Sequence, residues 1–461
     1  MNQLLAINAQ YPALFSSRAI ATNQVGYETL GPKFAVLALG DGPDFTMLRL
    51  RDAATGAVVF ETTPGRAAGV DSWKTQRWQS AEFTGFTGTG RFVLEAVDAG
   101  GARLVSAPFE IAGKLYAERF PAALLGYFHS QRTQEPYLGA DRAVPFIGSK
   151  RDTPADVHGG WYDASGDVSK YLSHLSYANF MNPQQTPLVV WSLSKAAVCP
   201  HIDANLHAAF RAEALWGADF LVRMCDPQGM FYMTVFDRWS GDTAQREICS
   251  YSTQQGHKHD TWEAGYRQGG GMAIAALARA ARLKQDGEFT AAEYLATAER
   301  AFAHLEVHNR EYLDDGKENI IDDYCALLAA TELSRSTHKP EYLAKAGERA
   351  ARLIDRLTSG HGYDGWWRAD NGTRPFFHAS DEGLPIAALV DYLVIAPEAD
   401  RTRVAAALGK VVRHLTAITA EVENPFAYPR QLVKRSDGTI ATQFFYPHGN
   451  DSGYWWQGEN A

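Results

Sequence analysis

The segment His158–Tyr171, with the sequence HGGWYDASGDVSKY, places two aspartates four residues apart, directly after a pair of aromatic residues. From Val168 onward the apolar residues recur with helical spacing, which predicts a helix over 167–181 that begins at Asp167 and is approached by a turn containing Asp163. The N–H groups and the macrodipole at a helix N-terminus favour an ionised carboxylate. Because a carboxylate must be ionised to take a proton from water, the pattern is typical of a general base.

A structural interpretation explains the same residues without any chemistry. A turn rich in Gly and Asp commonly caps a helix, and the two aromatic residues, Trp161 and Tyr162, would then be buried at the bend. The local spacing alone favours this interpretation.

The wider segment resembles the Gly-Gly-Trp-Tyr-Asp-Ala-Gly-Asp motif of glycoside hydrolase family 9, which contains the endoglucanases and their relatives. The resemblance implies that Asp167 activates the water that attacks the anomeric carbon and that Asp163 helps to hold this water, with Trp161 and Tyr162 in the substrate site. It also implies cleavage of a β-1,4 bond with inversion and without a cofactor. Ser165 adds one residue to the commoner family spacing, and this departure resembles a side branch that includes exo-acting glucosaminidases.

Length and composition are typical of a large folded enzyme. The chain has 461 residues, of which 46% are hydrophobic and 12% aromatic, enough for two domains with a substantial core. It carries 44 basic and 53 acidic residues, a net charge of −9, and no Lys/Arg block interleaved with aromatic residues, which excludes nucleic acid as a partner. The opening MNQLLAINAQYPALFSS has neither a basic segment nor a long apolar run, so we expect a cytoplasmic protein without a membrane partner.

The four cysteines, Cys199, Cys225, Cys249 and Cys325, show no CxxC and no zinc-binding spacing. We therefore expect free, mostly buried thiols, and no metal or other cofactor.

Two regimes of composition divide the chain near residue 113. The first contains short runs of strand-forming residues separated by Gly, Asp, Pro and Asn. These runs are KFAVLAL (33–39), FTMLRLRD (45–52), AVVFETT (57–63), RFVLEAVD (91–98) and SAPFEIAG (106–113). They predict an immunoglobulin-like β-sandwich over 16–113, and the segment IATNQVGYETLGPKFAVL resembles the immunoglobulin-like module that often precedes family 9 catalytic domains.

The second regime, 114–461, is a succession of amphipathic helices for which an antiparallel toroid is the natural closure. We expect helices over 115–132, 167–181, 186–198, 203–225, 262–284, 290–309, 319–337, 339–359, 380–396, 398–420 and 450–461. The resemblance implies an (α/α)6 barrel whose last helix supplies a glutamate as the general acid. No Asn-Glu segment of that kind precedes Ala461, so we expect a barrel truncated at its C-terminus, with Glu459 beside Trp455 and Trp456 as the one substitute acid.

Further polar and aromatic side chains gather at the starts of the predicted helices. The substrate-binding candidates are Asp323, Tyr324, His378, Asp381, Glu382, His448, Trp455, Trp456 and Glu459. Singly, each residue is explained by helix capping, but together they predict an acidic cleft that would attract the ammonium group of glucosamine. In the aromatic segment 361–377, Trp366 and Trp367 are expected to close one end of this cleft and to make the enzyme exo-acting.

The sequence therefore predicts an inverting glycoside hydrolase that acts from the end of glucosamine or chito-oligosaccharides. Two alternatives stay open: an endo-β-1,4-glucanase, and a sugar-binding protein that lacks its catalytic acid.

Overall fold

The computed structural model describes residues 18–70, 77–164, 166–173, 183–252, 255–378, 380–435 and 437–444. The chain forms two compact units. The first contains the described residues up to Ala122 together with Thr416–Gln431 and 443–444, and the second contains Ala123–Leu415 and Leu432–Thr442.

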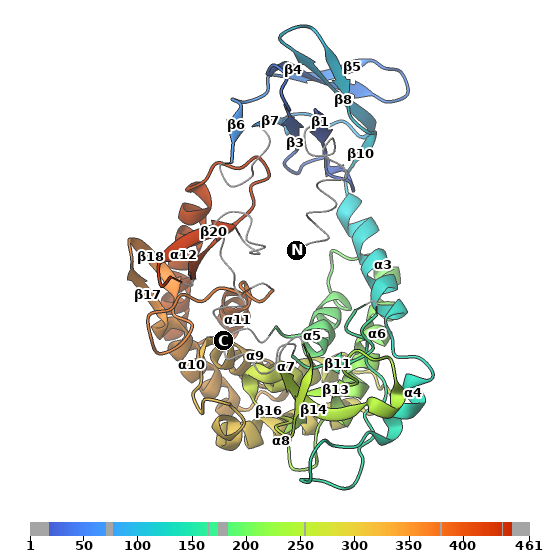
Figure 1. Cartoon of the computed structure of the whole chain (residues 1–461), viewed down its shortest axis with the longest axis vertical. Helices are drawn as coiled ribbons and strands as arrows, with labels where there is room; N and C mark the ends of the chain where they lie inside the picture. The colour runs from blue at the N-terminus through green and yellow to red at the C-terminus, as the bar shows by residue number, and fades with distance from the viewer. Residues whose placement is uncertain are drawn as a thin grey trace. The chain divides into compact units, whose positions relative to one another are not determined.

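Two sheets build the first unit (Figure 1). One sheet has the order β1 (Ala19–Ala21), β3 (Phe34–Ala38), β7 (Arg77–Glu82) and β6 (Ala68–Gly69). The other has the order β2 (Tyr27–Glu28), β10 (Phe109–Ala112), β8 (Gly90–Asp98), β4 (Phe45–Asp52) and β5 (Val58–Thr62), with β9 (Arg103–Val105) also paired to β8. All pairs are antiparallel except β2 with β10.

The two sheets of this unit share one hydrophobic core. Leu37 of β3 and Ala81 of β7 come from one sheet, while Leu50 of β4, Leu94 of β8 and Ile111 of β10 come from the other, and all are buried. On β4, the buried Leu48 and Leu50 alternate with half-buried neighbours, the period of a strand with one face on a core. The predicted β-sandwich is confirmed, and all five predicted runs form strands.

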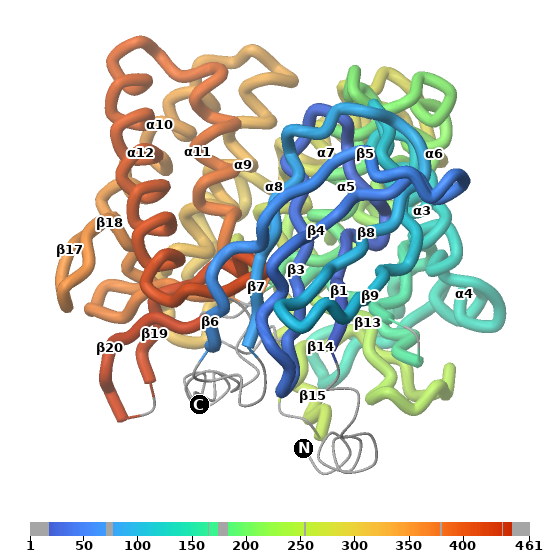
Figure 2. Tube along the Cα trace, turned by 90° about the horizontal axis from the view of Figure 1, so that it is seen from above, coloured from blue at the N-terminus to red at the C-terminus, as the bar shows by residue number. Residues whose placement is uncertain are grey.

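Helices arranged in hairpins dominate the second unit. Their bounds are α3 (Leu115–Ser130, which enters from the first unit), α4 (Tyr137–Ala140), α5 (Thr186–Ala196), α6 (Ala204–Arg223), α7 (Gly271–Ala281), α8 (Ala291–His308), α9 (Ile320–Thr337), α10 (Pro340–Asp355), α11 (Leu384–Leu393) and α12 (Glu398–Ala420). The helices α5, α7, α9 and α11 pack one against the next, and α6, α8 and α10 each pack on the helix before them. Figure 2 shows α9, α10 and α11 side by side.

This alternation of inner and outer helices explains their composition. Almost every residue of α7 and α9 is buried, as is typical of inner helices. The outer helix α10 exposes a polar face and buries Ala346, Ala350 and Leu353.

The prediction of a helix over 167–181 is wrong for the residues that the structure describes. Lys170–Tyr171 instead forms the short strand β11, in a sheet of order β11, β13 (Thr234–Phe236), β14 (Glu247–Ser252) and β15 (His257–His259). Tyr171 and Leu172 are both buried although they point to opposite sides of the chain, and a segment buried on both sides mimics helical spacing.

The predicted helix 262–284 begins later than expected. Its first residues form β16 (Glu263–Ala264), which pairs with β12 (Phe231–Tyr232), and a π-helical turn, Tyr266–Gly270, precedes α7. Gly269 has φ 101°, a left-handed conformation that interrupts the helix.

The aromatic segment 361–377 is also more regular than expected. The strands β17 (Leu357–Gly360) and β18 (Tyr363–Trp367) form a hairpin, and Trp366 and Trp367 are each 4% exposed. Because both indoles are buried in this structure, they do not close the end of a sugar cleft, and this prediction is corrected. A further hairpin joins β19 (Arg430–Lys434) to β20 (Ile440–Phe444).

The four cysteines are free, and three of them are buried, as predicted. None of the helices in the described part of the chain combines the length and the apolar character that a bilayer crossing requires.

Candidate active site

The turn that carries the two aspartates is built on a pair of glycines. Gly159 and Gly160 have φ of 90° and 74°, and a Cβ on Gly160 would lie 2.8 Å from Cγ of Phe220. Only glycine fits this close approach to α6 without strain. Trp161 follows directly, is 4% exposed, and donates from Nε1 to Glu213 at 2.8 Å. Trp161 is therefore a core residue in this structure, as the structural interpretation of the sequence expected, and its ring is not open to a sugar.

A buried cluster of charged side chains forms hydrogen bonds with the backbone that leads into this turn. Lys170 is fully buried and donates from Nζ to the carbonyl oxygens of Val157 and Gly159, at 2.6 and 2.9 Å. It also pairs with Asp141, which Arg246 contacts through two nitrogens at 2.6 and 2.8 Å. Burial lowers the pKa of Lys170 to about 8. Burial raises the pKa of Asp141, but the two cations outweigh this effect and its pKa stays below the ordinary value.

Asp167 is half-buried and accepts hydrogen bonds from three donors. Tyr171 Oη and Trp239 Nε1 donate to Oδ2 at 2.9 and 3.0 Å, and the backbone N–H of Ser169 donates to Oδ1 at 2.9 Å. Burial raises the pKa of Tyr171 far above its ordinary value, so its hydroxyl keeps its proton and acts as a donor. Among the described residues, Asp167 forms no ion pair. Three neutral donors suit an ionised carboxylate, which can only accept.

Asp163 lies on the other side of the same turn. Its backbone N–H donates to the carbonyl oxygen of Ser169 at 3.1 Å, which ties the two ends of the turn together. Nε2 of Gln185 donates to Oδ1 of Asp163 at 2.6 Å. The backbone of this turn therefore closes with Asp163 and Asp167 near each other, although no helix begins at Asp167.

A left-handed segment places Trp239 on Asp167. Arg238 and Trp239 have φ of 61° and 58°, uncommon values for residues with a side chain. The buried Asp237 holds the segment by accepting from Trp239 N at 3.1 Å and from Gly241 N at 2.8 Å. It also accepts from Ser169 Oγ at 2.9 Å, which connects this segment to the aspartate turn. The Trp239 ring is 38% exposed, so the residue that contacts Asp167 is also open to solvent.

Asp323 does not belong to an open acidic cleft. Its carboxylate is 0% exposed and is paired with Arg356 Nε at 2.6 Å and with Arg352 Nε at 3.0 Å. A third arginine, Arg349, lies 3.6 Å away. A carboxylate neutralised in this way cannot attract a cationic sugar, so the structure corrects this part of the prediction. Tyr324 is also fully buried and donates to Asp381 at 3.3 Å.

His378 and Asp381 are buried as well. Burial raises the pKa of Asp381 to about 7 and that of its neighbour Glu382 to about 8, while it lowers the pKa of His378 to about 3. The backbone N–H of Asp381 donates to Nδ1 of this neutral histidine at 2.9 Å. Carboxyl groups that resist ionisation do not attract an ammonium group, so the predicted electrostatic preference for glucosamine loses its support.

Asp381 is nevertheless connected to the aspartate turn. The backbone N–H of Gln184 donates to Oδ2 of Asp381 at 3.0 Å, and the next residue, Gln185, contacts Asp163. The neighbouring residues Gln184 and Gln185 thus link Asp381 to Asp163 of the aspartate turn.

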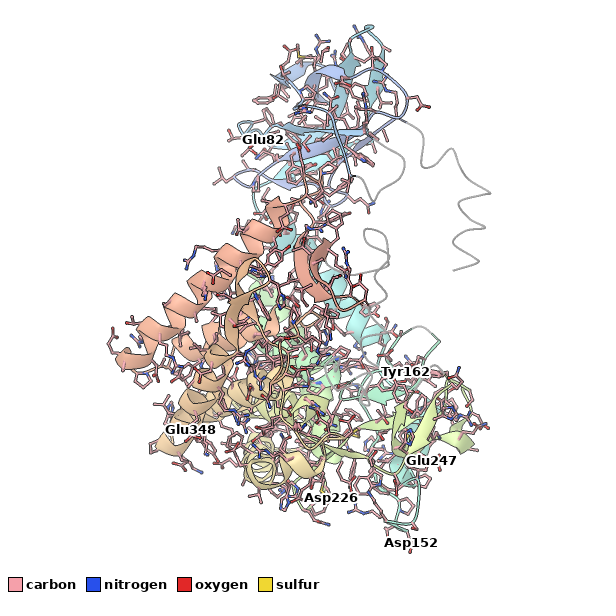
Figure 3. The ribbon with its side chains drawn as sticks, turned by 60° about the vertical axis from the view of Figure 1, so that its left-hand side comes forward. Glu82, Asp152, Tyr162, Asp226, Glu247 and Glu348 are labelled. Carbon is pink, nitrogen blue, oxygen red and sulfur yellow. The ribbon has the colours of Figure 1, made fainter. Side chains whose placement is uncertain are left out.

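Tyr162 stays near the turn and is half-buried. Its Oη accepts from the backbone N–H of Gln134 at 3.0 Å, and its ring packs edge-on against Tyr137. Figure 3 labels Tyr162 in this turn and Glu247 on β14 of the adjacent sheet. The remaining candidates lie outside the described residues: His448, Trp455, Trp456 and Glu459.

Sequence reasoning missed Trp239 and Gln185. The segment DRWSGD (237–242) places one tryptophan among turn-forming polar residues, a pattern that indicates an exposed aromatic side chain. Gln185 carries no comparable signal, because its contact with Asp163 depends on the fold. Among the described residues, no group of three or more His, Cys, Asp or Glu has the geometry to hold a metal ion.

Two half-exposed aspartates on one turn, with one of them held by neutral donors, are consistent with a glycosidase that activates water. Residues 116–392 match the family model described as glycosyl hydrolase family 9, and residues 16–100 match the cellulase N-terminal ig-like domain. Since the first match spans more than half of the chain, the protein belongs to glycosyl hydrolase family 9. It is an O-glycosyl hydrolase, and inversion is typical of its family.

Solved structures show the same fold. A metagenome-derived glycoside hydrolase family 9 endoglucanase is 22% identical, with a TM-score of 0.59 over 89% of this chain and 75% of that chain. The Bacteroides ovatus GH9 structure gives the same values. The family 9 endoglucanase J30 is 20% identical, with a TM-score of 0.55 over 87% of this chain and 73% of that chain. No curated protein matches the chain.

Proposed function

We propose that this family 9 protein cleaves β-1,4-glycosidic bonds with inversion, with Asp167 as the general base and Asp163 as a second group that holds the attacking water. The observation that carries this proposal is the environment of Asp167, whose carboxylate accepts from Tyr171, Trp239 and the Ser169 backbone and forms no ion pair with any described residue. A base of this kind can take the proton of a water as that water attacks C1.

The substrate we propose is a β-1,4-glucan. The argument for glucosamine rested on the spacing at Ser165 and on an acidic cleft, and the two strongest carboxylates of that cleft are unsuitable because Asp323 is paired with arginines and burial raises the pKa of Asp381 to about 7. The argument for exo action rested on Trp366 and Trp367, which are buried. Two of the similar solved structures are described as endoglucanases, which supports the alternative of endo cleavage.

Inversion also requires a protonated carboxyl group on the opposite side of the scissile bond, roughly 6.5 to 9.5 Å from the base. The family resemblance assigns this role to a glutamate of a later helix, and we put forward no described residue for it. We further propose that the alternating hairpins of α5 to α12 are part of an (α/α)6 barrel.

The test compares the wild type with Asp167→Asn on soluble cello-oligosaccharides and on glucosamine oligosaccharides of the same length. We expect the wild type to cleave the cello-oligosaccharides at internal bonds and to have the lower kcat/KM on the glucosamine series. The variant keeps the size of the side chain but cannot accept a proton, so kcat should fall by about a thousandfold.

Asp152→Asn is the matched control, because Asp152 is exposed (Figure 3) and is not among the hydrogen-bond partners given above for Asp163 and Asp167. It should keep wild-type turnover. An Asp167→Asn variant that folds and keeps wild-type kcat would refute the assignment of the base, and a higher kcat/KM on the glucosamine series would refute the proposed substrate.

A further inference from the structure

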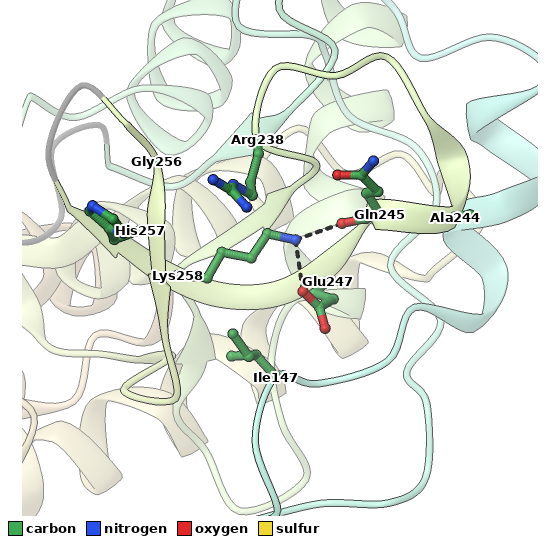
Figure 4. A pocket seen from close by; sticks show the side chains of 8 residues that line it. All are labelled: Ile147, Arg238, Ala244, Gln245, Glu247, Gly256, His257 and Lys258. Atoms are coloured by element: carbon green, nitrogen blue, oxygen red, sulfur yellow. Dashed lines mark hydrogen bonds and ion pairs between the residues drawn. The ribbon is translucent and has the colours of Figure 1, made fainter.

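A pocket of about 430 Å³ lies on the small sheet next to the aspartate turn (Figure 4). Its polar lining comes from β14, β15 and the segments beside them, namely Arg238, Gln245, Glu247, His257 and Lys258. The volume falls within the range of small-molecule sites, about 300–1,000 Å³.

Lys258 occupies the middle of this pocket. Its side chain is 7% exposed, and Nζ donates to the carbonyl oxygen of Gln245 at 2.6 Å and to Oε2 of Glu247 at 2.7 Å (Figure 4). Glu247 therefore balances the charge of the ammonium group. An ammonium has three N–H bonds, and these two contacts use two of them.

Arg238 adds a charge that nothing in the described structure balances. Its side chain is exposed, points into the pocket in Figure 4, and forms no hydrogen bond or ion pair with the described residues. The pocket thus has an excess of positive charge in a chain whose net charge is −9. A guanidinium presents paired N–H donors that match the two oxygens of a carboxylate.

The indole ring of Trp239 contacts both the candidate base and the neighbourhood of a residue that lines the pocket. Gly256 lines the pocket, and a Cβ at this position would lie 3.0 Å from Cζ3 of Trp239. The opposite side of the same ring donates from Nε1 to Asp167. Arg238 is also the residue that directly precedes Trp239 in the chain.

We propose that this pocket binds a carboxylate carried by a sugar unit of the substrate, through the guanidinium of Arg238 and the unused N–H of Lys258. The inference rests on the proposed function and narrows its substrate to β-1,4-linked oligosaccharides that contain an acidic unit. The hydroxyls of a neutral glucose unit can accept hydrogen bonds from these cations, but only a carboxylate also pairs with their positive charge, so the preference should depend on the carboxylate.

The test measures kcat/KM on cellotetraose and on the same tetrasaccharide with a C6 carboxylate in one unit. We expect the wild type to favour the carboxylated substrate, and Arg238→Gln to reduce the ratio of the two kcat/KM values by about tenfold, the effect of losing a hydrogen bond to a charged group. Arg142→Gln is the matched control, because Arg142 is equally an exposed arginine of this unit. It should leave the ratio unchanged.

An Arg238→Gln variant that slows both substrates equally, or a wild type without preference, would overturn the proposal. Calorimetric titration of the wild type and of Asp167→Asn with the carboxylated product separates this inference from the proposed function, because it needs no turnover. If the carboxylated product binds to the wild type and Arg238→Gln abolishes this binding, the proposed carboxylate site is supported even if no substrate is cleaved. Inorganic phosphate that binds as tightly as the carboxylated sugar would show a simple anion site and would also overturn the proposal.

Discussion

Asp167 and Asp323 are residues of the same type, and the sequence predicts both at the start of a helix and in a sugar cleft, yet the structure gives them opposite environments. Asp167 is half-exposed and accepts only from neutral donors. Asp323 is buried and paired with Arg356 and Arg352. A buried charge paired with arginines has a structural role, whereas an open carboxylate held by neutral donors can exchange a proton with water.

The largest expected effect is a loss of stability on substitution of Asp323. Asp323→Asn removes the negative charge but leaves the arginines of α10 beside a neutral side chain, and loss of one partner of a buried ion pair costs about 3–5 kcal/mol. We expect the free energy of unfolding, measured with urea, to fall by about this amount. Asp167→Asn should change it by less than about 1 kcal/mol, and equal losses in the two variants would contradict the comparison.

Asp381 differs from both, because it is buried and no cation of the described residues pairs with it, so its contribution to stability depends on pH. In the folded protein its pKa is about 7, whereas an unfolded chain releases the same proton near pH 3.8. Between these pH values the folded protein keeps the proton and the unfolded chain has released it. The free energy of unfolding therefore falls as the pH rises from about 4 to about 7, by about 1.4 kcal/mol for each pH unit.

Urea unfolding at pH 4 and pH 8 measures this loss. Asp381→Asn should match the wild type at pH 4 and exceed it at pH 8, since the amide cannot ionise. The exposed Asp152→Asn should follow the wild type at both values. A variant that is less stable than the wild type at pH 8 would show that the ionised form of Asp381 is stabilising.

The smallest expected effect comes from removing one of the hydrogen-bond donors to Asp167. Trp239→Phe keeps an aromatic ring but removes Nε1–H, and we expect kcat to fall by about tenfold while KM changes little. Trp191 is the matched control because its Nε1 donates to another carboxylate, Glu332, at 2.8 Å. Trp191→Phe should leave kcat of the folded fraction unchanged. Equal effects of the two variants on kcat would mean that Trp239 does not position the base.

The parts of the fold that depend on local chemistry could be predicted from the sequence. Thr290 and Glu293 form a capping box at the start of α8, and Pro340 begins α10, so both helices start within a residue of the prediction. The strand β4 was predictable because its alternation follows from one buried face.

The sequence predictions that were wrong concern segments whose structure depends on residues far away in the chain. Lys170–Tyr171 forms a strand because it pairs with Thr234–Val235, more than sixty residues later, and no local pattern reveals that pairing. The aspartate pair was located by its motif, but its donor Trp239 comes from the distant strand connection after β13. For Asp323, Arg349 and Arg352 of α10 and Arg356 directly after it recur at helical spacing, a signal that was present in the sequence but needed the packing of α9 on α10 to be interpreted.

The configuration of the first product tests the central claim most directly. Proton NMR during the first minutes of hydrolysis of a β-1,4-linked cello-oligosaccharide distinguishes the two anomers of the new reducing end before they equilibrate. A water activated by Asp167 attacks from the face opposite the leaving group, so the α-anomer should appear first. If the β-anomer appears first, the reaction proceeds with retention, and the role assigned to Asp167 is contradicted.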